Sequence, residues 1–400
     1  MPRRRPVGGF DFAILARSGK VSPLKELVLR IAEAVLRKSS RDNPADAVLR
    51  AELRRHRGLP KAESREVARL VFAWHRWRGW LDERLPLQKT CAQAIELQKR
   101  YNESPSSFSD ADLASRAVPG WVCSQVKTSA EWVRTLQSEP KLWLRAGCGQ
   151  GKRVASALGD CWIPSSHGLA DAIEYQGDED LFRSPEFHAG EFEVQDINSQ
   201  VVGLVCEPRA GETWWDACAG EGGKTLHLSD LMTNKGLIWA SDRAQWRLNR
   251  LKLRAGRAKV FNYRSVLWDG GTKLPTRTKF DGVLVDAPCS GIGTWQRNPH
   301  ARWTTMESDI DELAQVQLGL LVNAANAVKP GGRLLFAVCT LTEAETNGVA
   351  QAFQERHPEF KRLPLPNPFR PDSPDRSEHG LWLWPQETGG NGMFVAGWIR

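Results

Sequence analysis

The chain has 400 residues, of which 41% are hydrophobic and 26% charged, with a formal net charge of +8, and this is the composition of an ordinary globular protein. Its length exceeds what one compact core usually holds, so two or three domains are expected. No apolar run approaches the roughly 18 to 20 residues that cross a bilayer, and the opening Met1-Pro-Arg-Arg-Arg5 lacks the apolar core of a signal peptide. These features exclude a membrane protein and predict a cytoplasmic one.

The positive charge is concentrated at the front of the chain. Residues 1–86 contain 20 lysines and arginines against 10 aspartates and glutamates, which leaves the rest of the chain slightly negative. A basic front segment favours a polyanionic partner. A solvated helix surface explains the same composition equally well.

The first third of the chain has the apolar spacing of helices. Ser22 and Pro23 are typical of a helix start. A second helix is expected over 62–85, with these apolar residues on one face: Val67, Leu70, Val71, Trp74, Leu81 and Leu85. The residues between them include four arginines: Arg65, Arg69, Arg76 and Arg78. Alternating arginine and tryptophan fits a nucleic-acid surface, but tryptophans at this spacing more often pack in a core, which we prefer. Residues 103–118 predict a linker.

Two further regions follow. Residues 119–195 predict a small α+β module, because 141–146 alternates like a short strand and Gly and Pro mark frequent turns. After residue 196, short apolar runs alternate with helical segments such as 245–255 and 313–328. The expected parallel strands are 213–217, 237–241, 282–286 and 333–338. This pattern predicts a doubly wound α/β domain, with 392–398 as a final antiparallel edge strand.

A glycine turn connects the first of these strands to a helix. It reads Asp216-Ala-Cys-Ala-Gly-Glu-Gly-Gly-Lys-Thr225, and such a turn lets a ligand approach backbone amides at a helix N-terminus. A P-loop requires a glycine where Cys218 stands, so a nucleoside triphosphatase is not favoured. A dinucleotide and S-adenosylmethionine both fit, since Asp242 ends the next strand where a carboxylate binds ribose hydroxyls.

Two of the eight cysteines stand at the ends of predicted strands. No Cys-x-x-Cys pair is present, so neither a disulfide framework nor a zinc site is expected. The run Phe280-Asp-Gly-Val-Leu-Val-Asp-Ala-Pro-Cys-Ser-Gly291 contains Asp286 and Cys289, and Gly332-Arg-Leu-Leu-Phe-Ala-Val-Cys-Thr340 contains Cys339. A single cysteine is usually a small buried hydrophobe. Because ligands bind beyond the carboxyl ends of parallel strands, two thiols and a carboxylate delivered there favour a catalytic role.

This set of groups suits methylation of cytosine at carbon 5. That carbon is a poor nucleophile, and a thiolate that adds to carbon 6 makes it nucleophilic. A carboxylate near the ring nitrogen supports protonation at N3 during the addition. A second thiol can assist release of the first after methyl transfer.

The three motifs together resemble the RsmB/Nop/Sun family of RNA cytosine-5 methyltransferases. Val194-Gln-Asp-Ile-Asn-Ser-Gln200 and Arg297-Asn-Pro-His-Ala-Arg-Trp303 extend the resemblance, which covers nearly the whole chain. It implies a NusB-like all-α RNA-binding domain over 1–118 and a small RNA-recognition-like module over 119–195. Over 196–400 it implies an α/β, Rossmann-like class I methyltransferase domain.

The resemblance also assigns residues. It makes Cys339 the nucleophile, gives Cys289 a role in product release, and places Asp286 against the flipped cytosine with Lys224 in the active site. The residues expected to contact S-adenosylmethionine are Cys218, Ala219, Gly220, Glu221, Gly222, Gly223, Lys224, Asp242, Arg247, Asp269 and Asp286. Glu221 departs from the proline usual in the family. The acid usual after the third strand is missing from 260–265, and Asp269 is the nearest, so the adenine contact stays open.

Several alternatives remain open. A catalytically silent RNA-binding or ribosome-assembly factor would keep the fold, but it has no need for the intact thiols. A DNA cytosine methyltransferase leaves Cys339 and the helical front without a role, and a nicotinamide dehydrogenase explains only the glycines and Asp242. Among RNA substrates, ribosomal RNA is favoured by the NusB-like front and transfer RNA is the alternative. A monomer is expected.

Overall fold

The computed structural model describes residues 23–370 and 380–400, and its internal contacts divide the chain into two compact units. The helical unit takes the described residues up to Gly120 together with Ser129–Ser138 and Asn298–Thr305. The α/β unit takes Trp121–Thr128, Glu139–Arg297 and the described residues from Met306 onward. The proposed helix start at Ser22 and the basic residues before it lie outside the described part.

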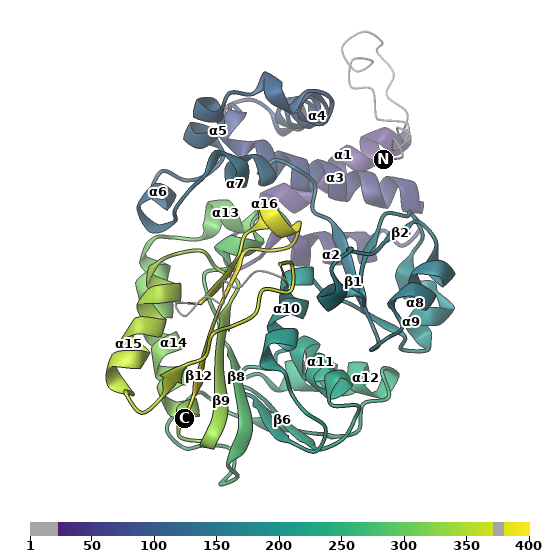
Figure 1. The fold of residues 1–400 in the computed structure, drawn as a ribbon. Coiled ribbons are helices and arrows are strands. Elements are labelled where there is room, and N and C mark those ends of the chain that lie inside the picture. The colour runs from purple at the N-terminus through teal and green to yellow at the C-terminus, as the bar shows by residue number, and fades with distance from the viewer. Residues whose placement is uncertain (1–22, 371–379) are drawn as a thin grey trace. The chain divides into compact units, whose positions relative to one another are not determined.

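The helical unit is built from amphipathic helices, of which those before residue 138 are drawn in purple to blue in Figure 1 and the short one near residue 301 in green. Its helices are α1 (Pro23–Lys38), α2 (Ala45–Arg55), α3 (Lys61–Trp77), α4 (Leu87–Glu103), α5 (Asp110–Arg116), α7 (Ala130–Thr135) and the distant α13 (Ala301–Thr304). Val67, Leu70, Val71 and Trp77 of α3 are fully buried, and Trp74 is 8% exposed. The preferred core position of these tryptophans is therefore confirmed. The helical character of the region is established, whereas its NusB-like identity stays a prediction.

Two expectations for this region are wrong. The helix predicted over 62–85 ends at Trp77, and a short 3₁₀ turn at Arg78–Trp80 follows. Within this turn, position 79 has no room for a side chain, because a Cβ there would lie 1.9 Å from the carbonyl oxygen of Arg116. The linker predicted over 103–118 contains α5, whose first turn is capped by the Ser109 hydroxyl accepting a hydrogen bond from the amide of Asp112. The serines and aspartates of this segment mark a helix start rather than a flexible connection.

The α/β unit contains a small antiparallel sheet. Its strands, in the order β2-β3-β1-β4, are β1 (Leu142–Ala146), β2 (Cys161–Trp162), β3 (Ala172–Tyr175) and β4 (Phe192–Val194). Two short helices accompany it, α8 (Gly151–Leu158) and α9 (Pro185–His188). The strand predicted at 141–146 is confirmed. The division into three domains stays a prediction, since the contacts place this sheet in the same unit as the large one.

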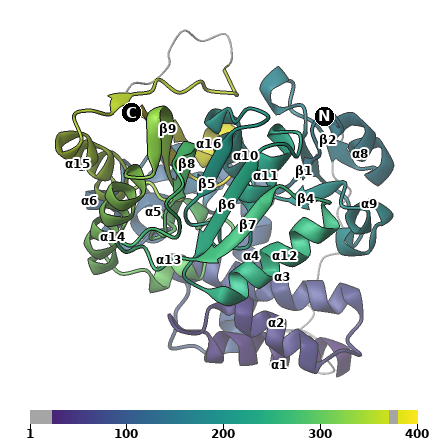
Figure 2. The ribbon, with the colours of Figure 1, turned by 90° about the horizontal axis from the view of Figure 1, so that it is seen from below.

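The large sheet has eight strands in the order β10-β12-β9-β8-β5-β6-β7, with β11 also paired to β12. They are β5 (Thr213–Asp216), β6 (Leu237–Asp242), β7 (Tyr263–Leu267), β8 (Phe280–Asp286), β9 (Val328–Val338), β10 (Lys361–Arg362), β11 (Leu381–Leu383) and β12 (Met393–Ile399). The helices of this unit also include α6 (Val122–Gln125), α10 (Ile197–Cys206), α11 (Gly223–Leu231), α12 (Gln245–Arg257), α14 (Ser308–Ala325), α15 (Val349–Arg356) and α16 (Pro385–Thr388). Figure 2 shows β9, β8, β5, β6 and β7 side by side, all of them parallel. The predicted doubly wound α/β domain is thus confirmed.

The last strand differs from the prediction. β12 is antiparallel to β9, as expected, but it is not an edge, because β10 and β11 pair with its other side. Their segments are too short to show a strand pattern in the sequence.

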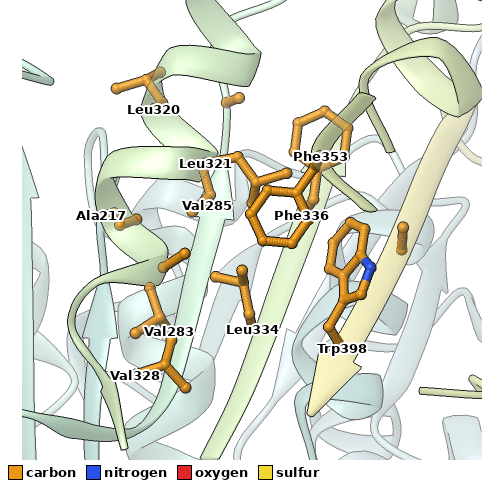
Figure 3. Packing of buried hydrophobic residues seen from close by; sticks show 14 of the residues in the cluster. Ala217, Val283, Val285, Leu320, Leu321, Val328, Leu334, Phe336, Phe353 and Trp398 are labelled. Carbon is orange, nitrogen blue, oxygen red and sulfur yellow. The ribbon is translucent and has the colours of Figure 1, made fainter. Parts of the chain in front are cut away.

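Side chains of the central strands alternate between two apolar layers. Val283 and Val285 pack on one face with Leu334 and Phe336, against Leu321 of α14 (Figure 3). Leu284, Leu335 and Ala337 point to the other face, where they join Val201 of α10 and Leu228 of α11. Because both faces of the sheet are covered, polar groups of these strands reach solvent only at their ends. That constraint locates the candidate site.

Candidate active site

The chain order reverses between β5 and β8, and a cavity of about 530 Å³ opens beside the carboxyl ends of these strands. In a doubly wound sheet this switch point is where ligands bind. The cavity is lined by nearly all the predicted site residues: Cys218, Ala219, Gly220, Glu221, Gly223, Lys224, Asp242, Arg247, Asp269, Asp286, Cys289 and Cys339. Gly222 is the exception. It has a φ of +87°, and a Cβ there would lie 2.6 Å from Leu251, so it shapes the turn from behind.

The glycine turn is held by the carboxylate at the end of β6. The amide of Gly220 donates to Asp242 Oδ2 at 3.0 Å, and the amide of Ala244 donates to Oδ1 at 2.8 Å. Arg247 Nη1 lies 3.6 Å from the same carboxylate. Gly220 has a φ of +56° and nothing within 4 Å of its Cβ position, so a side chain there would enter the open space of the turn. An open glycine position beside a fixed carboxylate fits the ribose end of a nucleoside cofactor.

A buried carboxylate supports the turn from below. Asp216, at the end of β5, is fully buried and accepts a hydrogen bond of 2.6 Å from the hydroxyl of Thr225. Burial raises the pKa of Asp216 to about 7, although the Thr225 hydrogen bond opposes that rise. This contact ties the first turn of α11 to the sheet.

A lysine–aspartate pair occupies the middle of the cavity. Lys224 Nζ, in the first turn of α11, lies 2.6 Å from Asp286 Oδ2 at the end of β8. Burial acts to lower the pKa of Lys224, but the Asp286 charge outweighs it and the pKa is raised. The pair therefore presents both a proton donor and a proton acceptor to any ligand ring placed against it.

The thiols of Cys289 and Cys339 are in direct contact. Cys289 Sγ and Cys339 Sγ lie 3.3 Å apart, although 50 residues separate them in the chain. The hydrogen bond with Cys289 lowers the pKa of Cys339 against the effects of burial and of the Asp286 charge, and Lys224 and Arg297 also lower it. The same hydrogen bond, burial and the nearby charges of Cys339 and Glu345 raise the pKa of Cys289 well above its ordinary value. Cys339 is therefore the more acidic of the two thiols and the one that favours the thiolate form.

The lining of the cavity also includes residues that the sequence did not single out. Asp196, Ser199, Arg297 and Asn391 line it. Asp196 accepts hydrogen bonds from the amide of Asn198 at 3.0 Å and from the amide of Asn391 at 2.9 Å. Burial raises the pKa of Asp196, while Arg297 opposes that rise. Asp196, Ser199 and Arg297 belong to the two motifs quoted as supporting the resemblance, and that was the available signal.

A second positive region lies on the α/β unit. Residues 243–268 contain eight lysines and arginines and no acid, a local excess hidden when charge is counted over whole domains. Along α12, Trp246 and Leu253 are 57% and 75% exposed, and Arg250 and Lys252 are exposed beside them. Arg254 and Arg257 pair instead with the buried Glu193. The exposed face of α12 is therefore basic and partly apolar, and Arg247 connects it to the cavity.

The described residues contain neither a metal-ion site nor a helix that could span a membrane. In 23–370 and 380–400 no group of three or more His, Cys, Asp or Glu side chains is arranged to hold a metal ion. No helix in those ranges combines the length and the apolar character that crossing a bilayer requires.

Comparison with known proteins gives consistent results. Residues 203–399 match the family model described as 16S rRNA methyltransferase RsmB/F. The chain is 35% identical to a probable ribosomal RNA small subunit methyltransferase B of Synechocystis sp. over 222 residues, 53% of this chain and 48% of that protein. It is 30% identical to the ribosomal RNA small subunit methyltransferase B of Cronobacter sakazakii over 327 residues, 76% of this chain and 71% of that protein. The matched part thus spans about half of the Synechocystis protein.

The fold also has solved counterparts. The crystal structure of PH0851 superposes with a TM-score of 0.78 at 24% identity, covering 96% of this chain and all of that one. At this level of identity the likeness concerns the fold alone.

Proposed function

Because the chain belongs to the 16S rRNA methyltransferase RsmB/F family, we propose that it transfers a methyl group from S-adenosylmethionine to carbon 5 of a cytosine in ribosomal RNA. The observation that carries this proposal is the contact of Cys289 and Cys339 at 3.3 Å beside the Lys224–Asp286 pair. A methyltransferase acting directly on an oxygen or nitrogen has no need for a thiolate paired with a thiol. Neither a nicotinamide dehydrogenase nor a silent factor gives these groups a task.

The cavity has room and groups for both reactants. S-adenosylmethionine supplies an electrophilic methyl group, and the residues that would hold it are the open turn at Gly220, the carboxylate of Asp242 and Arg247. The target base, splayed out of its stack at a cost of a few kcal/mol, would lie between the thiols and the Lys224–Asp286 pair. Asp196 and Arg297 border that side of the cavity.

The residues of the chain then have separate tasks. The Cys339 thiolate adds to carbon 6 of cytosine, and the Lys224–Asp286 pair supports protonation of the ring at N3, which makes carbon 5 nucleophilic. After methylation the carbon-5 proton passes to solvent, its bonding electrons form the double bond between carbons 5 and 6, and the bond between carbon 6 and Cys339 Sγ breaks to return the thiolate. The N3 proton returns to the Lys224–Asp286 pair. The Cys289 thiol donates a hydrogen bond to the departing sulfur, which makes Cys339 the better leaving group.

RNA as the substrate is supported by charge. The basic face of α12 and the excess of lysine and arginine in 1–86 both suit the phosphates of a polyanion. Ribosomal rather than transfer RNA rests on the activity named for the relatives. We place the reaction in the cytoplasm, where thiols stay reduced, and all eight cysteines are free in the structure.

The test separates the two thiols. Cys339→Ala should bind RNA, form no covalent adduct and methylate nothing. Cys289→Ala should still attack and methylate but release slowly, so a protein–RNA band should survive denaturing electrophoresis. An adduct from Cys339→Ala instead would reverse the assignments. Full activity in both variants would remove the mechanism. Bisulfite sequencing of ribosomal and transfer RNA from a deletion strain identifies the modified cytosine.

A further inference from the structure

A buried carboxylate lies behind the two thiols and belongs to neither the cofactor nor the substrate side. Glu345 has an exposed fraction of 0% and stands in a short π-helical segment, Ala344–Gly348, ahead of α15. π-helical turns are rare and often mark functional positions. Among the described residues its partners are hydrogen-bond donors, and no cation forms a salt bridge with it.

Those hydrogen bonds come from the loops that carry the thiols. On the Cys289 side, the amide of Ser290 donates to Glu345 Oε1 at 2.8 Å and the Ser290 hydroxyl donates to Oε2 at 2.5 Å. On the Cys339 side, Thr340 Oγ1 lies 3.1 Å from Oε2, and the Thr342 hydroxyl donates to Oε2 at 2.9 Å. The residue that follows each cysteine therefore binds the same carboxylate.

A glutamine completes the hydrogen-bond network around Glu345. Gln317 of α14, fully buried, donates through Nε2 to Glu345 Oε1 and to the carbonyl oxygen of Pro288, both at 2.9 Å. Pro288 and Ser290 flank Cys289, so the backbone on both sides of this thiol is fixed through Glu345 and Gln317. No comparable set of contacts is needed to hold the sheet, because β8 and β9 already pair along their length.

We propose that Glu345 is a positioning residue that joins the Cys289 loop to the Cys339 loop and holds the two sulfurs in contact. Its second effect is electrostatic. Its carboxylate accepts from the amide of Ser290, next to Cys289, and its charge raises the pKa of Cys289, whereas Lys224 and Arg297 lower the pKa of Cys339. The inference deepens the proposed function and relies on it only for the meaning of the thiol pair.

The two oxygens of Glu345 allow position and charge to be separated. Oε1 accepts from N–H groups of Ser290 and Gln317, which can only donate. Oε2 faces three hydroxyls, of Ser290, Thr340 and Thr342, which can rotate and accept. Glu345→Gln can therefore keep the network with its amide nitrogen at Oε2 while losing the charge, whereas Glu345→Ala loses both.

The first readout needs no RNA. Iodoacetamide reacts with thiolates, and peptide mass spectrometry gives the alkylation rates of Cys339 and Cys289 against pH. We expect Cys339 to react much faster in the wild type. In Glu345→Ala the Cys339 rate at pH 7 should fall about tenfold, the change that one pKa unit produces, and the preference for Cys339 should be lost. Glu345→Gln should keep most of the Cys339 rate with a reduced preference.

The control is Asp281→Asn at the opposite end of β8, where the carboxylate accepts from the amide of Thr213 at 2.8 Å and from Lys329 at 2.7 Å. It should lower the melting temperature and leave the thiol rates unchanged. With RNA and S-adenosylmethionine, Glu345→Ala should lower the maximal single-turnover methylation rate at least about tenfold. The RNA concentration that gives half of that rate should stay unchanged. Glu345→Gln should keep most of the wild-type rate.

The proposal would be overturned if the alkylation rates of Cys339 and Cys289 in Glu345→Ala equalled those of the wild type. It would also be overturned if Asp281→Asn lowered the Cys339 alkylation rate as much as Glu345→Ala does. If the wild type methylates no RNA, the proposed function fails, while the alkylation rates still decide the role of Glu345.

Discussion

Arg302 of the helical unit and Glu345 of the α/β unit both have an exposed fraction of 0%, and they differ in what they hold together. In the helical unit, Arg302 donates to the carbonyl oxygens of Ala117 at 2.9 Å and Leu136 at 2.8 Å, and more weakly to that of Arg76 at 3.4 Å. In the α/β unit, Glu345 accepts from groups beside the two thiols. Both residues tie together segments that are distant in the chain.

The difference lies in what the tied segments carry. The carbonyls around Arg302 end α3, α5 and α7, and none of those segments contributes to the cavity. Burial lowers the pKa of Arg302 to about 9, so it remains charged at neutral pH. The groups around Glu345 set the distance between two reactive sulfurs. A buried charged side chain therefore marks a place where several segments of the chain are hydrogen-bonded together. Whether that place serves stability or chemistry depends on the residues that these segments carry.

The largest change in free energy is expected when Arg302, which holds three helix ends together, is replaced. Arg302→Met keeps most of the stem but leaves buried carbonyls without a donor, which should destabilise the helical unit by about 3–5 kcal/mol. Hydrogen exchange of α3 and α5 measures the loss, since a protein with two units need not unfold in one step. Arg57→Met, at an exposed arginine of the same unit, is the control and should change little. Changed alkylation rates at Cys339 would contradict the separation of the roles of Arg302 and Glu345.

Asp242 is a buried carboxylate of the α/β unit whose contacts end at the cavity, so it should affect binding more than stability. Asp242→Ala releases the amides of Gly220 and Ala244 and should weaken S-adenosylmethionine binding by about 1–3 kcal/mol. Calorimetric titration measures it. Asp269→Ala, at an exposed acid that also lines the cavity, should cost less. If the protein bound NAD tightly and did not bind S-adenosylmethionine, the methyltransferase assignment would be wrong.

The thiol pair should show a dependence on pH. The Cys289 hydrogen bond lowers the pKa of Cys339, so Cys289→Ala should raise that pKa and shift the rise of Cys339 alkylation to higher pH. At neutral pH the Cys339 rate should therefore fall a few-fold. The exposed Cys123 in the same sample serves as an internal reference. An unchanged profile would mean that Cys289 does not lower the pKa of Cys339.

The smallest effect is expected on the basic face of α12. Arg250→Gln and Lys252→Gln should each reduce the slope of log K against log salt for RNA binding by about 0.7 to 0.9, with little change in stability. Lys361→Gln, at an exposed lysine on the other edge of the large sheet, is the matched control. Equal slopes for all variants would leave α12 as an ordinary solvated surface.

The sequence alone determined the architecture of the α/β unit and most of its site. Short apolar runs separated by helical segments predict parallel strands, and strand ends converge at one edge of such a sheet. Residues that follow strands, such as Asp242, Asp286 and Cys339, could therefore be placed from pattern alone. The same logic identified the glycine turn, because glycine adopts positive φ without steric cost and leaves room for a ligand.

Only the tertiary structure decided the rest. Glu345 has no distinguishing pattern in the sequence, and its role follows from donors that lie 3 to 55 residues away. The helix at 110–116 and the pairing that removes β12 from the edge likewise depend on distant contacts. The spacing of apolar residues predicts which face of a helix or strand is buried. A buried charge, by contrast, is stabilised by hydrogen-bond partners that are distant in the sequence. Those partners can be identified only from the folded structure.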